Sequence, residues 1–483
     1  MKTKTLGRLA GSLFLFFLAF SLRLHKIDNP VADWHSWRQA DTAAVSRSFY
    51  QEEFNLLYPR ADNFYPMSEG SLPNPERYFL NEFPFYNSLA AGLYYLNGGV
   101  NEVWARLVSV FFSSLGAVLL YLLASQLLAK RTAFLSGLFF AVLPFNIYYG
   151  RVIMPDPTFI CLSILSLYLA VCWLKKENFL AGLAFSLSLA LAILVKPYAL
   201  FLGLPLAYLI LSKWGWKTFQ RSEIYLFLIF SLLPFGLWRW HINRFPEGMF
   251  GSGWLINQGQ IRFSGAFFRW LIFERMNRLI FASGGFVLFW LGLAAPRRKK
   301  EGLFFLAWLL GAVGYMTYFA RGNVTHDYYQ LPLVPVGCCL MAKGVIFLLG
   351  IGRDWLSRLI NRTLALGLVL LMLAFGWYEV RGFFNINHPE IVEAGRAVDR
   401  LTPSKARVIA PYQRDPAFLY QTNRSGWSAL DSAEQLREFI TDGATHYVSV
   451  NFDEITNQLT GQCPVLEKTE RYVIVELENC INK

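Results

Sequence analysis

Long apolar runs recur between residues 6 and 378, and they restrict the fold more than any other feature of the chain. A helix needs roughly 17–25 apolar residues to cross the hydrocarbon core of a membrane. Eleven segments meet or approach this length, near residues 6–24, 104–128, 132–149, 156–174, 178–194, 197–212, 222–240, 279–295, 303–319, 331–350 and 359–378. The sequence therefore predicts a polytopic α-helical membrane protein with about 11 transmembrane helices.

Charge divides the chain into two parts. Only 16% of all residues are charged, below the roughly 25% of a soluble domain. Residues 385–483 hold 14 acidic and 10 basic residues, whereas the first 384 hold 19 acidic and 35 basic. The boundary near residue 384 predicts a change from membrane to water. This composition excludes a soluble enzyme, a disordered chain and a disulfide-dense secreted module.

The basic residues also predict the orientation. They gather in alternate connections, as the positive-inside rule requires of cytoplasmic ones: Lys2, Lys4, Arg8, Lys130, Arg131, Lys175, Lys176, Lys213, Lys217, Arg221, Arg297, Arg298, Lys299, Lys300, Arg353, Arg358 and Arg362. We therefore expect a cytoplasmic N-terminus, and an odd number of spans then places the charged tail outside. The first apolar run lacks a small-residue cleavage site and is expected to remain as an anchor.

Two outside regions are large enough to fold. The first loop, residues 25–103, has helical apolar spacing at 36–54 and 79–97, which predicts helices lying in the membrane interface. The tail predicts a small α/β domain, with strands near 407–411, 445–451 and 471–477 and helices near 389–401, 432–441 and 453–459. Cys463 and Cys480 lie in this tail, in the only oxidising compartment available, and are predicted to form a disulfide.

Polar residues concentrate in the loops that this topology places outside. Polar groups near membrane depth are costly and therefore mark candidate sites. They occur at residues 33–42 and 81–84 of the first loop, 150–157 after the third span, 196–198 between the fifth and sixth, and 321–332 after the ninth. Because all five segments are predicted on one side, we expect them to converge on one cavity.

Cations in these loops suggest an anionic ligand. The outside arginines include Arg38, Arg151, Arg239, Arg244, Arg262, Arg269, Arg275 and Arg278. Arginine binds phosphate through a bidentate fork, so an outer-leaflet lipid phosphate would explain them. The alternative for Arg239, Arg275 and Arg278 is that they anchor helix ends at headgroups. Apart from Lys26 and the tail, Lys196 is the only outside lysine, which favours a functional role.

Four short motifs in the predicted outside loops resemble those of a known family in their order along the chain. They are the acidic segment from Asp33 to Asp41 behind one anchor span, Arg151-x-x-x-Pro-Asp156, Lys196-Pro-Tyr198, and His326-Asp-Tyr-Tyr-x-Leu-Pro-Leu333. This pattern is similar to the GT-C superfamily, in the group of protein O-mannosyltransferases and the lipid A aminoarabinose transferase (glycosyltransferase family 39). The resemblance implies a GT-C transmembrane catalytic domain over residues 1–384 and an extracytoplasmic α/β domain over 385–483.

The same resemblance implies an activity. Such enzymes transfer a sugar from a polyprenyl-phosphate donor to an acceptor, typically with inversion. A general base must take the proton of the acceptor hydroxyl, and cations must stabilise the departing lipid phosphate. The family's Asp-Glu pair aligns here with Arg38 and Gln39. The base is therefore open between Asp41, which lies one helical turn further on and is favoured, and Asp33, just upstream.

Other residues of this chain also match positions of the family's motifs, and each match has an alternative. Glu82-Phe83-Pro84 resembles the family's Glu-Lys-Pro-Pro, so Arg38 or Arg151 would replace the missing lysine. Asp156 matches the second-loop acid, although it could also cap the following helix. Lys196 matches the phosphate-contacting lysine, although it could instead pair with an acid such as Asp156.

The predicted catalytic residues are Asp41, Asp33, Asp156 and Glu82, the phosphate-binding residues are Lys196, Arg38, Arg151 and Arg262, and the substrate cavity is lined by His35, Tyr198, His326, Asp327 and Tyr329. No cofactor is predicted, and a divalent cation at the outside acidic cluster stays open. The partners are a polyprenyl-phosphate sugar donor, a lipid, protein or glycan acceptor and membrane lipids, and not nucleic acid.

The expected location is the cytoplasmic (inner) membrane of a bacterium, with transfer on its outer face. Two alternatives share the features above. A transporter or flippase of lipid-linked glycans would also hold a lipid phosphate, but transporters often contain internal repeats, and the sequence shows none. A glycan polymerase or ligase would use the same chemistry on a longer donor.

Overall fold

The structure is a computed structural model of the chain and describes residues 2–65, 72–249, 251, 253–478 and 480. It divides into two compact units. Unit 1 consists of Met1–Ile27, Leu107–Arg239 and Ser252–Gly382. Unit 2 consists of Asp28–Arg106, Trp240–Gly251 and Phe383–Lys483. The first outside loop and the C-terminal tail therefore belong to the same unit.

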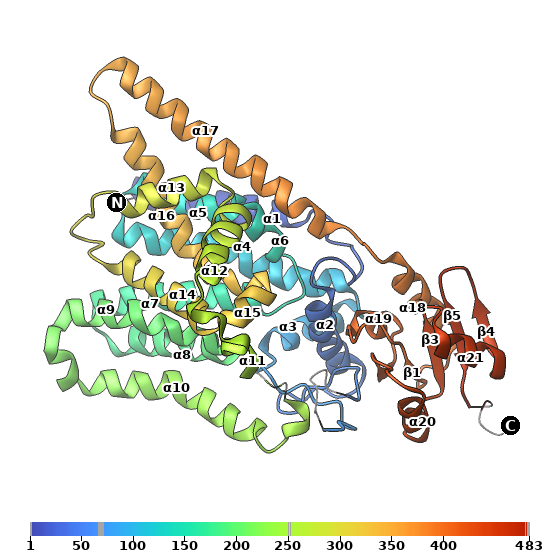
Figure 1. Cartoon of the computed structure of the whole chain (residues 1–483). Coiled ribbons are helices and arrows are strands. Elements are labelled where there is room, and N and C mark those ends of the chain that lie inside the picture. The colour runs from blue at the N-terminus through green and yellow to red at the C-terminus, as the bar shows by residue number, and fades with distance from the viewer. Residues whose placement is uncertain (1, 66–71, 250, 252, 479, 481–483) are drawn as a thin grey trace. The chain divides into compact units, whose positions relative to one another are not determined.

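Unit 1 is helical, and each of the eleven predicted segments contains helix. Its elements are α1 (Lys2–Arg23), α4 (Glu102–Leu127), α5 (Lys130–Val142), α6 (Pro144–Tyr149), α7 (Asp156–Lys176), α8 (Phe179–Val195), η1 (Pro197–Leu202), α9 (Gly203–Trp214), η2 (Gly215–Gln220), α10 (Ser222–Ile242), α11 (Gly253–Asn257), η4 (Gln258–Phe263), α12 (Gly265–Arg269), η5 (Trp270–Ile280), α13 (Gly284–Ala294), α14 (Phe304–Tyr318), α15 (Ala320–Thr325), η6 (Asp327–Gln330), α16 (Leu333–Gly350), α17 (Trp355–Val380) and η7 (Arg381–Phe384). The ends of α4, α10 and η7 reach into unit 2. Figure 1 shows α17 as a long, uninterrupted helix, drawn in orange.

The polytopic helical architecture is confirmed, with fewer full-length spans than predicted. In the described part of the chain, seven helical stretches are long and apolar enough to cross a membrane, or eight if a bent pair counts as one span. That pair is Gly265–Ile280 and Gly284–Ala294, and the helix direction bends by 114° between them. The predicted run 132–149 is divided before Pro144, because proline cannot donate the hydrogen bond that would continue α5. Two other runs form shorter apolar helices, α8 and α14.

Close helix packing in unit 1 depends on glycine. Helices α13 and α16 pack against each other along their lengths. A Cβ atom at Gly344 would lie 2.0 Å from the Leu288 carbonyl oxygen, and one at Gly292 would lie 1.8 Å from the Leu340 carbonyl oxygen. Small residues allow helix backbones to approach in this way inside membranes. The two backbones could not keep this separation with larger side chains.

In unit 2, the first loop contributes α2 (Ser36–Gln51) and α3 (Phe85–Asn97), which pack together. Both segments predicted to be helical therefore contain a helix, and their place in the membrane interface stays a prediction. Helix α3 begins at Phe85 rather than near residue 79. The segment before it is extended and forms backbone hydrogen bonds with residues far away in the sequence. Leu80 N–H donates to the carbonyl of Gly248, in η3 (Pro246–Gly248), at 2.8 Å.

The tail forms an α/β module, which we call the C-terminal module. It contains α18 (Pro389–Leu401), β1 (Arg407–Ile409), α19 (Pro416–Gln421), β2 (Ser425–Trp427), α20 (Ala433–Thr441), β3 (His446–Ser449), α21 (Glu454–Gln462), β4 (Val465–Lys468) and β5 (Val473–Glu476). The sheet has the order β2-β1-β3-β5-β4. Strand β1 is parallel to β2 and β3, whereas β5 is antiparallel to β3 and β4. The predicted strands and helices are present, while α19, β2 and β4 were not predicted.

Local sequence explains the ends of the helices in this module. The Ser432 hydroxyl accepts from Gln435 N–H at 3.1 Å, and the Gln435 side chain accepts from Asp431 N–H at 2.7 Å. This reciprocal arrangement resembles a capping box. The structure also contains the Cys463–Cys480 disulfide that the sequence predicts.

The core of the module receives side chains from the first loop. Its buried residues include Trp427, Phe439 and Tyr447. Phe64 and Tyr65 of the first loop pack against this core, with ring centroids 5.0 Å apart for Phe64 and Trp427. First loop and tail therefore share one hydrophobic core, which explains why they form one compact unit.

Candidate active site

A buried ion pair in unit 1 joins two of the predicted site residues. Asp156 is the first residue of α7, and Lys196 follows α8 in extended conformation. Lys196 Nζ lies 3.2 Å from Asp156 Oδ1, and each residue is only 3% exposed. The N-cap of α7 is Pro155, so Asp156 does not occupy the capping position considered for it. The pairing that the sequence left open for Lys196 is present in the structure.

Tyrosine rings surround the Lys196 ammonium. Nζ lies 5.5 Å from the ring centroid of Tyr198, 5.6 Å from that of Tyr328 and 6.0 Å from that of Tyr329. Cation–π contacts in a desolvated place contribute about 2 kcal/mol or more. His326 stacks against Tyr328 and Tyr329, with centroids 5.3 and 5.8 Å apart. The predicted cavity residues Tyr198, His326 and Tyr329 thus belong to one cluster with Lys196.

Asp327 connects this cluster to Tyr149 and Arg275, which are not among the predicted site residues. The Tyr149 hydroxyl donates to Asp327, and Arg275 Nη1 lies 3.8 Å from Asp327 Oδ2. The Arg275 guanidinium also lies 4.4 Å from the ring centroid of Trp270. Arg275 is therefore an ion-pair partner within the protein rather than a headgroup anchor. Tyr149 lies in an apolar run, where no sequence signal distinguishes it from its neighbours.

The two remaining arginines predicted for unit 1 differ in their surroundings. Arg151 is fully buried, and its Nη1 donates to the Lys26 carbonyl at 2.9 Å. Arg262 donates to the carbonyls of Thr317 and Tyr318, at 3.0 and 2.7 Å. These bonds hold the Arg262 guanidinium against the backbone, and its phosphate-binding role stays a prediction. Arg151 stays a candidate.

An apolar crevice adjoins the tyrosine cluster. It is lined by Phe159, Ile160, Ser163, Tyr198, Phe201, Leu202, Trp308, Ala312, Tyr315, Pro332 and Pro335. Tyr198 belongs to both places, because its ring centroid lies 5.6 Å from that of Tyr329 and 4.9 Å from that of Tyr315. The crevice is small, with a volume of about 20 Å³, and Tyr198 links it to the surroundings of the buried ammonium.

The predicted residues of the first loop lie in unit 2. Arg38 and Glu82 form an ion pair with 2.5 Å between Nη2 and Oε2. Asp33 accepts from Gln39 Nε2 at 2.6 Å, and Arg106 Nη2 lies 3.9 Å from its second oxygen. The Asp33 and Arg106 side chains are both fully buried. Neither Gln39 nor Arg106 was predicted as a site residue. Arg106 does have a recognisable signal, because it is a charged residue at the outer end of an apolar run.

Asp41 has a different environment on α2. It is 5% exposed, and burial raises its pKa to about 7. The Arg38 charge and a hydrogen bond with Trp37 oppose this shift, whereas the carboxylates of Asp415 and Asp62 add to it. A carboxyl group with a pKa near the working pH is suited to general base catalysis. Asp33, held by an amide and a guanidinium, does not share this environment.

His35 marks the start of α2. It occupies the N-cap position in left-handed conformation, with φ 56°, and its ring centroid lies 5.2 Å from that of Trp34. Trp34 stacks in turn on Phe383, with centroids 4.9 Å apart. His35 thus lies in unit 2, where its charge influences Asp415. Among the residues that the structure describes, no group of three or more His, Cys, Asp or Glu side chains is arranged to hold a metal ion.

Comparison with known proteins supports the resemblance found in the motifs. Residues 81–240 match a family described as dolichyl-phosphate-mannose-protein mannosyltransferase. This match covers α3 to most of α10 and includes Glu82, Arg151, Asp156 and Lys196. No curated protein matches the sequence at a significant level.

Solved structures with the same fold extend the comparison to the whole chain. ArnT from Cupriavidus metallidurans bound to undecaprenyl phosphate is similar with a TM-score of 0.64 and 14% identity, over 99% of both chains. The oligosaccharyltransferase of Archaeoglobus fulgidus in its apo form has a TM-score of 0.57 and 11% identity, over 92% of this chain and 69% of that one. The mycobacterial arabinofuranosyltransferase AftD has a TM-score of 0.54 and 14% identity, over 97% of this chain and 41% of that one. The expected fold, a polytopic helical region with a C-terminal α/β part, is confirmed.

Proposed function

We propose that this chain transfers a sugar from a polyprenyl-phosphate donor to an acceptor hydroxyl at a membrane surface. One observation carries the proposal: a GT-C fold in which a buried lysine, enclosed by tyrosines, adjoins an apolar crevice. The structural relative from Cupriavidus metallidurans is bound to undecaprenyl phosphate. The lipid monophosphate of a sugar donor has the same two chemical parts, an apolar chain and an anionic head.

Lys196 is proposed to bind the donor phosphate. Its ammonium is already desolvated and oriented by Asp156 and the tyrosine rings, so little reorganisation would be needed to bind an anion. Arg151, which is buried in the same unit, would add a second cation. Asp156 is then a residue that orients Lys196 rather than one that takes part in proton transfer.

Asp41 is proposed as the general base, in preference to Asp33. The oxygens of Asp33 are engaged by Gln39 and face the Arg106 guanidinium. The raised pKa of Asp41, about 7, suits a proton acceptor that works near neutral pH. Asp41 is therefore favoured over Asp33.

The proposed reaction is a single displacement. The Asp41 carboxylate takes the proton of the acceptor hydroxyl while the acceptor oxygen forms a bond to the anomeric carbon. The bond from that carbon to the phosphate oxygen breaks, and its electron pair leaves with the lipid phosphate, whose negative charge basic side chains stabilise. Attack opposite to the leaving group inverts the anomeric configuration. The products are the glycosylated acceptor, the lipid phosphate and a proton on the base.

The location follows from the charge pattern. Basic residues in alternate connections place the N-terminus in the cytoplasm and the C-terminal module outside. We accordingly propose transfer on the outer face of a bacterial cytoplasmic membrane. A lipid, a protein hydroxyl or a cell-envelope glycan would each supply the acceptor oxygen that the reaction requires.

The test is to incubate the purified full chain in lipid nanodiscs with radiolabelled polyprenyl-phosphate sugars. We expect transfer to an added acceptor, or slow hydrolysis of the donor in its absence, and loss of both in Asp41→Asn. Activity in Asp41→Asn together with inactivity in Asp33→Asn would move the base to Asp33. Lipid movement across a bilayer without cleavage of the donor would instead identify a flippase and refute the proposal.

A further inference from the structure

We propose that the C-terminal module holds α2, the helix that carries Asp41, and that Arg47 is the positioning residue through which it does so. The inference deepens the proposed function and rests on the assignment of Asp41 in it. The module is then part of the framework that places the base and not an appended domain.

Helix α2 is covered by protein on every side. The eleven residues from Gln39 to Phe49 are all buried, and they complete about three turns, so every face of this part of the helix is enclosed. Helix α3 packs on α2 and fastens its middle, because the Asn87 side chain donates to the Thr42 carbonyl at 2.7 Å. Helix α19 of the C-terminal module packs on α2 as well. The cover of α2 is therefore incomplete without the module.

The chain that leads into α2 is hydrogen-bonded to the tail. Three bonds connect residues 29–34 with residues 383–421: Asn29 Nδ2 donates to the Phe384 carbonyl at 2.9 Å, Trp34 N–H to the Phe383 carbonyl at 3.1 Å, and Gln421 Nε2 to the Val31 carbonyl at 3.0 Å. The rings of Trp34 and Phe383 also stack, with centroids 4.9 Å apart. The tail thus fixes the approach to the helix ahead of Ser36, its first residue.

Arg47 fastens the later part of α2. It is 6% exposed, its Nη1 donates to the Tyr420 carbonyl of α19 at 3.1 Å, and its guanidinium lies 4.3 Å from the Tyr420 ring centroid. Its Nη2 lies 2.5 Å from Asp62 Oδ2. The carbonyl of Asp62 accepts in turn from Gly426 N–H in β2, at 2.9 Å. Arg47 is therefore linked to the module twice, directly and through Asp62.

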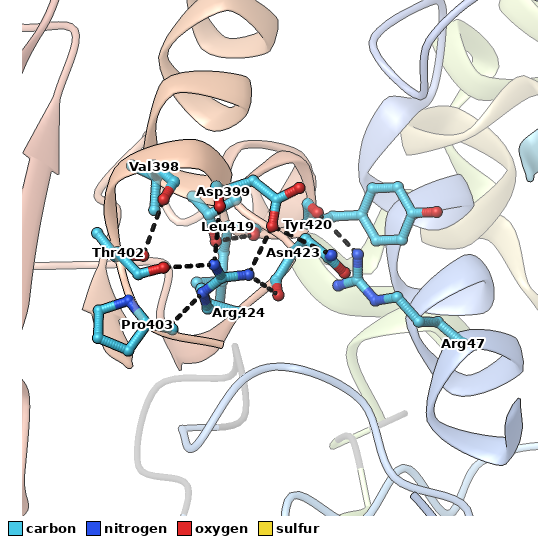
Figure 2. A network of polar contacts seen from close by, with 10 residues as sticks. Arg47, Val398, Asp399, Thr402, Pro403, Leu419, Tyr420, Asn423 and Arg424 are labelled. Atoms are coloured by element: carbon cyan, nitrogen blue, oxygen red, sulfur yellow. Dashed lines mark hydrogen bonds and ion pairs between the residues drawn. The ribbon is translucent and has the colours of Figure 1, made fainter. Parts of the chain in front are cut away.

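Helix α19 is itself fastened inside the module. Arg424, which follows it, is 6% exposed and donates through Nη1 to Asp399 Oδ1 of α18 at 2.7 Å and through Nη2 to the Thr402 carbonyl at 2.9 Å. Figure 2 shows this network beside the contact between Arg47 and Tyr420. Because α19 is held against α18, the bond from Arg47 ties α2 to the folded module and not to a single short helix.

These contacts affect the base because Arg47 and Asp41 lie on one helix. Asp41 precedes Arg47 by six residues, or about 9 Å along the helix axis. A displacement of about 1 Å at a reacting group can lower the rate about 100-fold. Arg47 acts here through the position of Asp41, so its loss should lower the rate of transfer and leave binding of the donor phosphate unchanged.

The first experiment compares Arg47→Gln with Arg77→Gln in lipid nanodiscs, well below the melting temperature of either variant. Arg77 is a matched control, since its guanidinium also joins a backbone carbonyl, that of Ala61 at 2.9 Å, to a carboxylate, that of Glu52 at 2.5 Å. Both of these partners lie in the first loop, whereas Arg47 reaches the module.

We expect kcat for sugar transfer to fall about 10–100-fold in Arg47→Gln, with unchanged affinity for undecaprenyl phosphate. Arg77→Gln should keep both values near those of the wild type. Arg47→Lys keeps a positive charge beside Asp62 but lacks the fork that also reaches Tyr420, so its kcat should be intermediate. If Arg47→Gln does not fold, Arg47→Lys takes its place in the comparison.

A second measurement does not need activity. Hydrogen exchange of backbone amides reports the local opening of a helix. We expect the amides of α2 to exchange faster in Arg47→Gln than in the wild type, whereas Arg77→Gln should leave them protected. Wild-type exchange of α2 in folded Arg47→Gln would show that Arg47 does not hold the helix.

The outcomes separate the two proposals. If Asp41→Asn is inactive while Arg47→Gln keeps the wild-type kcat, this inference fails and the base assignment stands. If Asp41→Asn is active, the base assignment fails, and the exchange of the α2 amides still decides whether Arg47 holds the helix. An equal fall of kcat in Arg77→Gln would also overturn the inference, because it would reflect a general loss of stability.

Discussion

Replacing Lys196 by alanine would remove one partner of a buried ion pair and leave Asp156 without the ammonium that lies 3.2 Å from it. Breaking a buried pair in this way typically costs about 3–5 kcal/mol, because the remaining charge is not compensated. Loss of the surrounding cation–π contacts adds to this cost. We therefore expect a clearly lower melting temperature for Lys196→Ala.

The same substitution should weaken binding of the donor. A hydrogen bond to a charged group contributes about 1.5–3 kcal/mol, which corresponds to about 10–150-fold in affinity. Lys196→Arg should recover only part of this, since a planar guanidinium does not replace a compact ammonium. Asp156→Asn should bind the phosphate at least as well as the wild type, because it removes a negative charge beside Lys196.

The assay is binding of undecaprenyl phosphate to detergent-purified protein, measured well below the melting temperature of the weakest variant. The informative variant carries both Lys196→Ala and Asp156→Asn, which leaves no uncompensated charge and should recover much of the lost stability. It should still bind the lipid phosphate weakly. Wild-type affinity in this stable double variant would show that Lys196 only joins two helices, and the phosphate-binding role would be refuted.

Four further predictions concern the base, the helix packing and the disulfide. Because the pKa of Asp41 is raised to about 7, its carboxylate should become available as pH rises through 7, so activity should fall on the acidic side of that value; a profile flat from pH 5 to 8 would contradict this. The same raised pKa means that folding stability should decrease between about pH 4 and pH 7 as the buried group ionises, and the decrease should be smaller in Asp41→Asn, as melting temperatures will show. Gly344→Ala should cost about 1–3 kcal/mol, since its Cβ would meet a backbone oxygen at 2.0 Å, whereas Gly350→Ala has open space and should melt like the wild type. Replacing Cys463 and Cys480 by serine should cost about 3 kcal/mol in the chain-entropy model, seen as a lower unfolding midpoint of the C-terminal module, and an unchanged midpoint would count against it.

Membrane helices and the strands of the C-terminal module could be recognised from the sequence because their signals are local. A span needs only a long apolar run, and all eleven predicted runs contain helix. The strands at β1, β3 and β5 have β-rich runs, and the caps of α20 and α21 have their own side-chain signals. The disulfide was predictable since Cys463 and Cys480 are the only cysteines of the tail. The GT-C resemblance likewise depended on short motifs, which can be recognised directly in the sequence.

Elements without a local signal were missed or misjudged. Helix α19 and strand β2 have three to six residues each, too few for a periodic pattern to emerge. Not every predicted run forms a full-length span, because Pro144 divides one run and α8 and α14 are shorter apolar helices.

The pairing of charges depended on packing between segments far apart in the chain. The sequence could place Asp156 and Lys196 on the same side, but whether they meet is decided by how α7 packs against α8. The surroundings of Asp41 depend even more on tertiary structure, because α19 of the tail packs on α2, the helix that carries Asp41. The free energy that brings such groups together comes from burial and from contacts along whole helices, and neither is encoded in the spacing of the charged residues themselves.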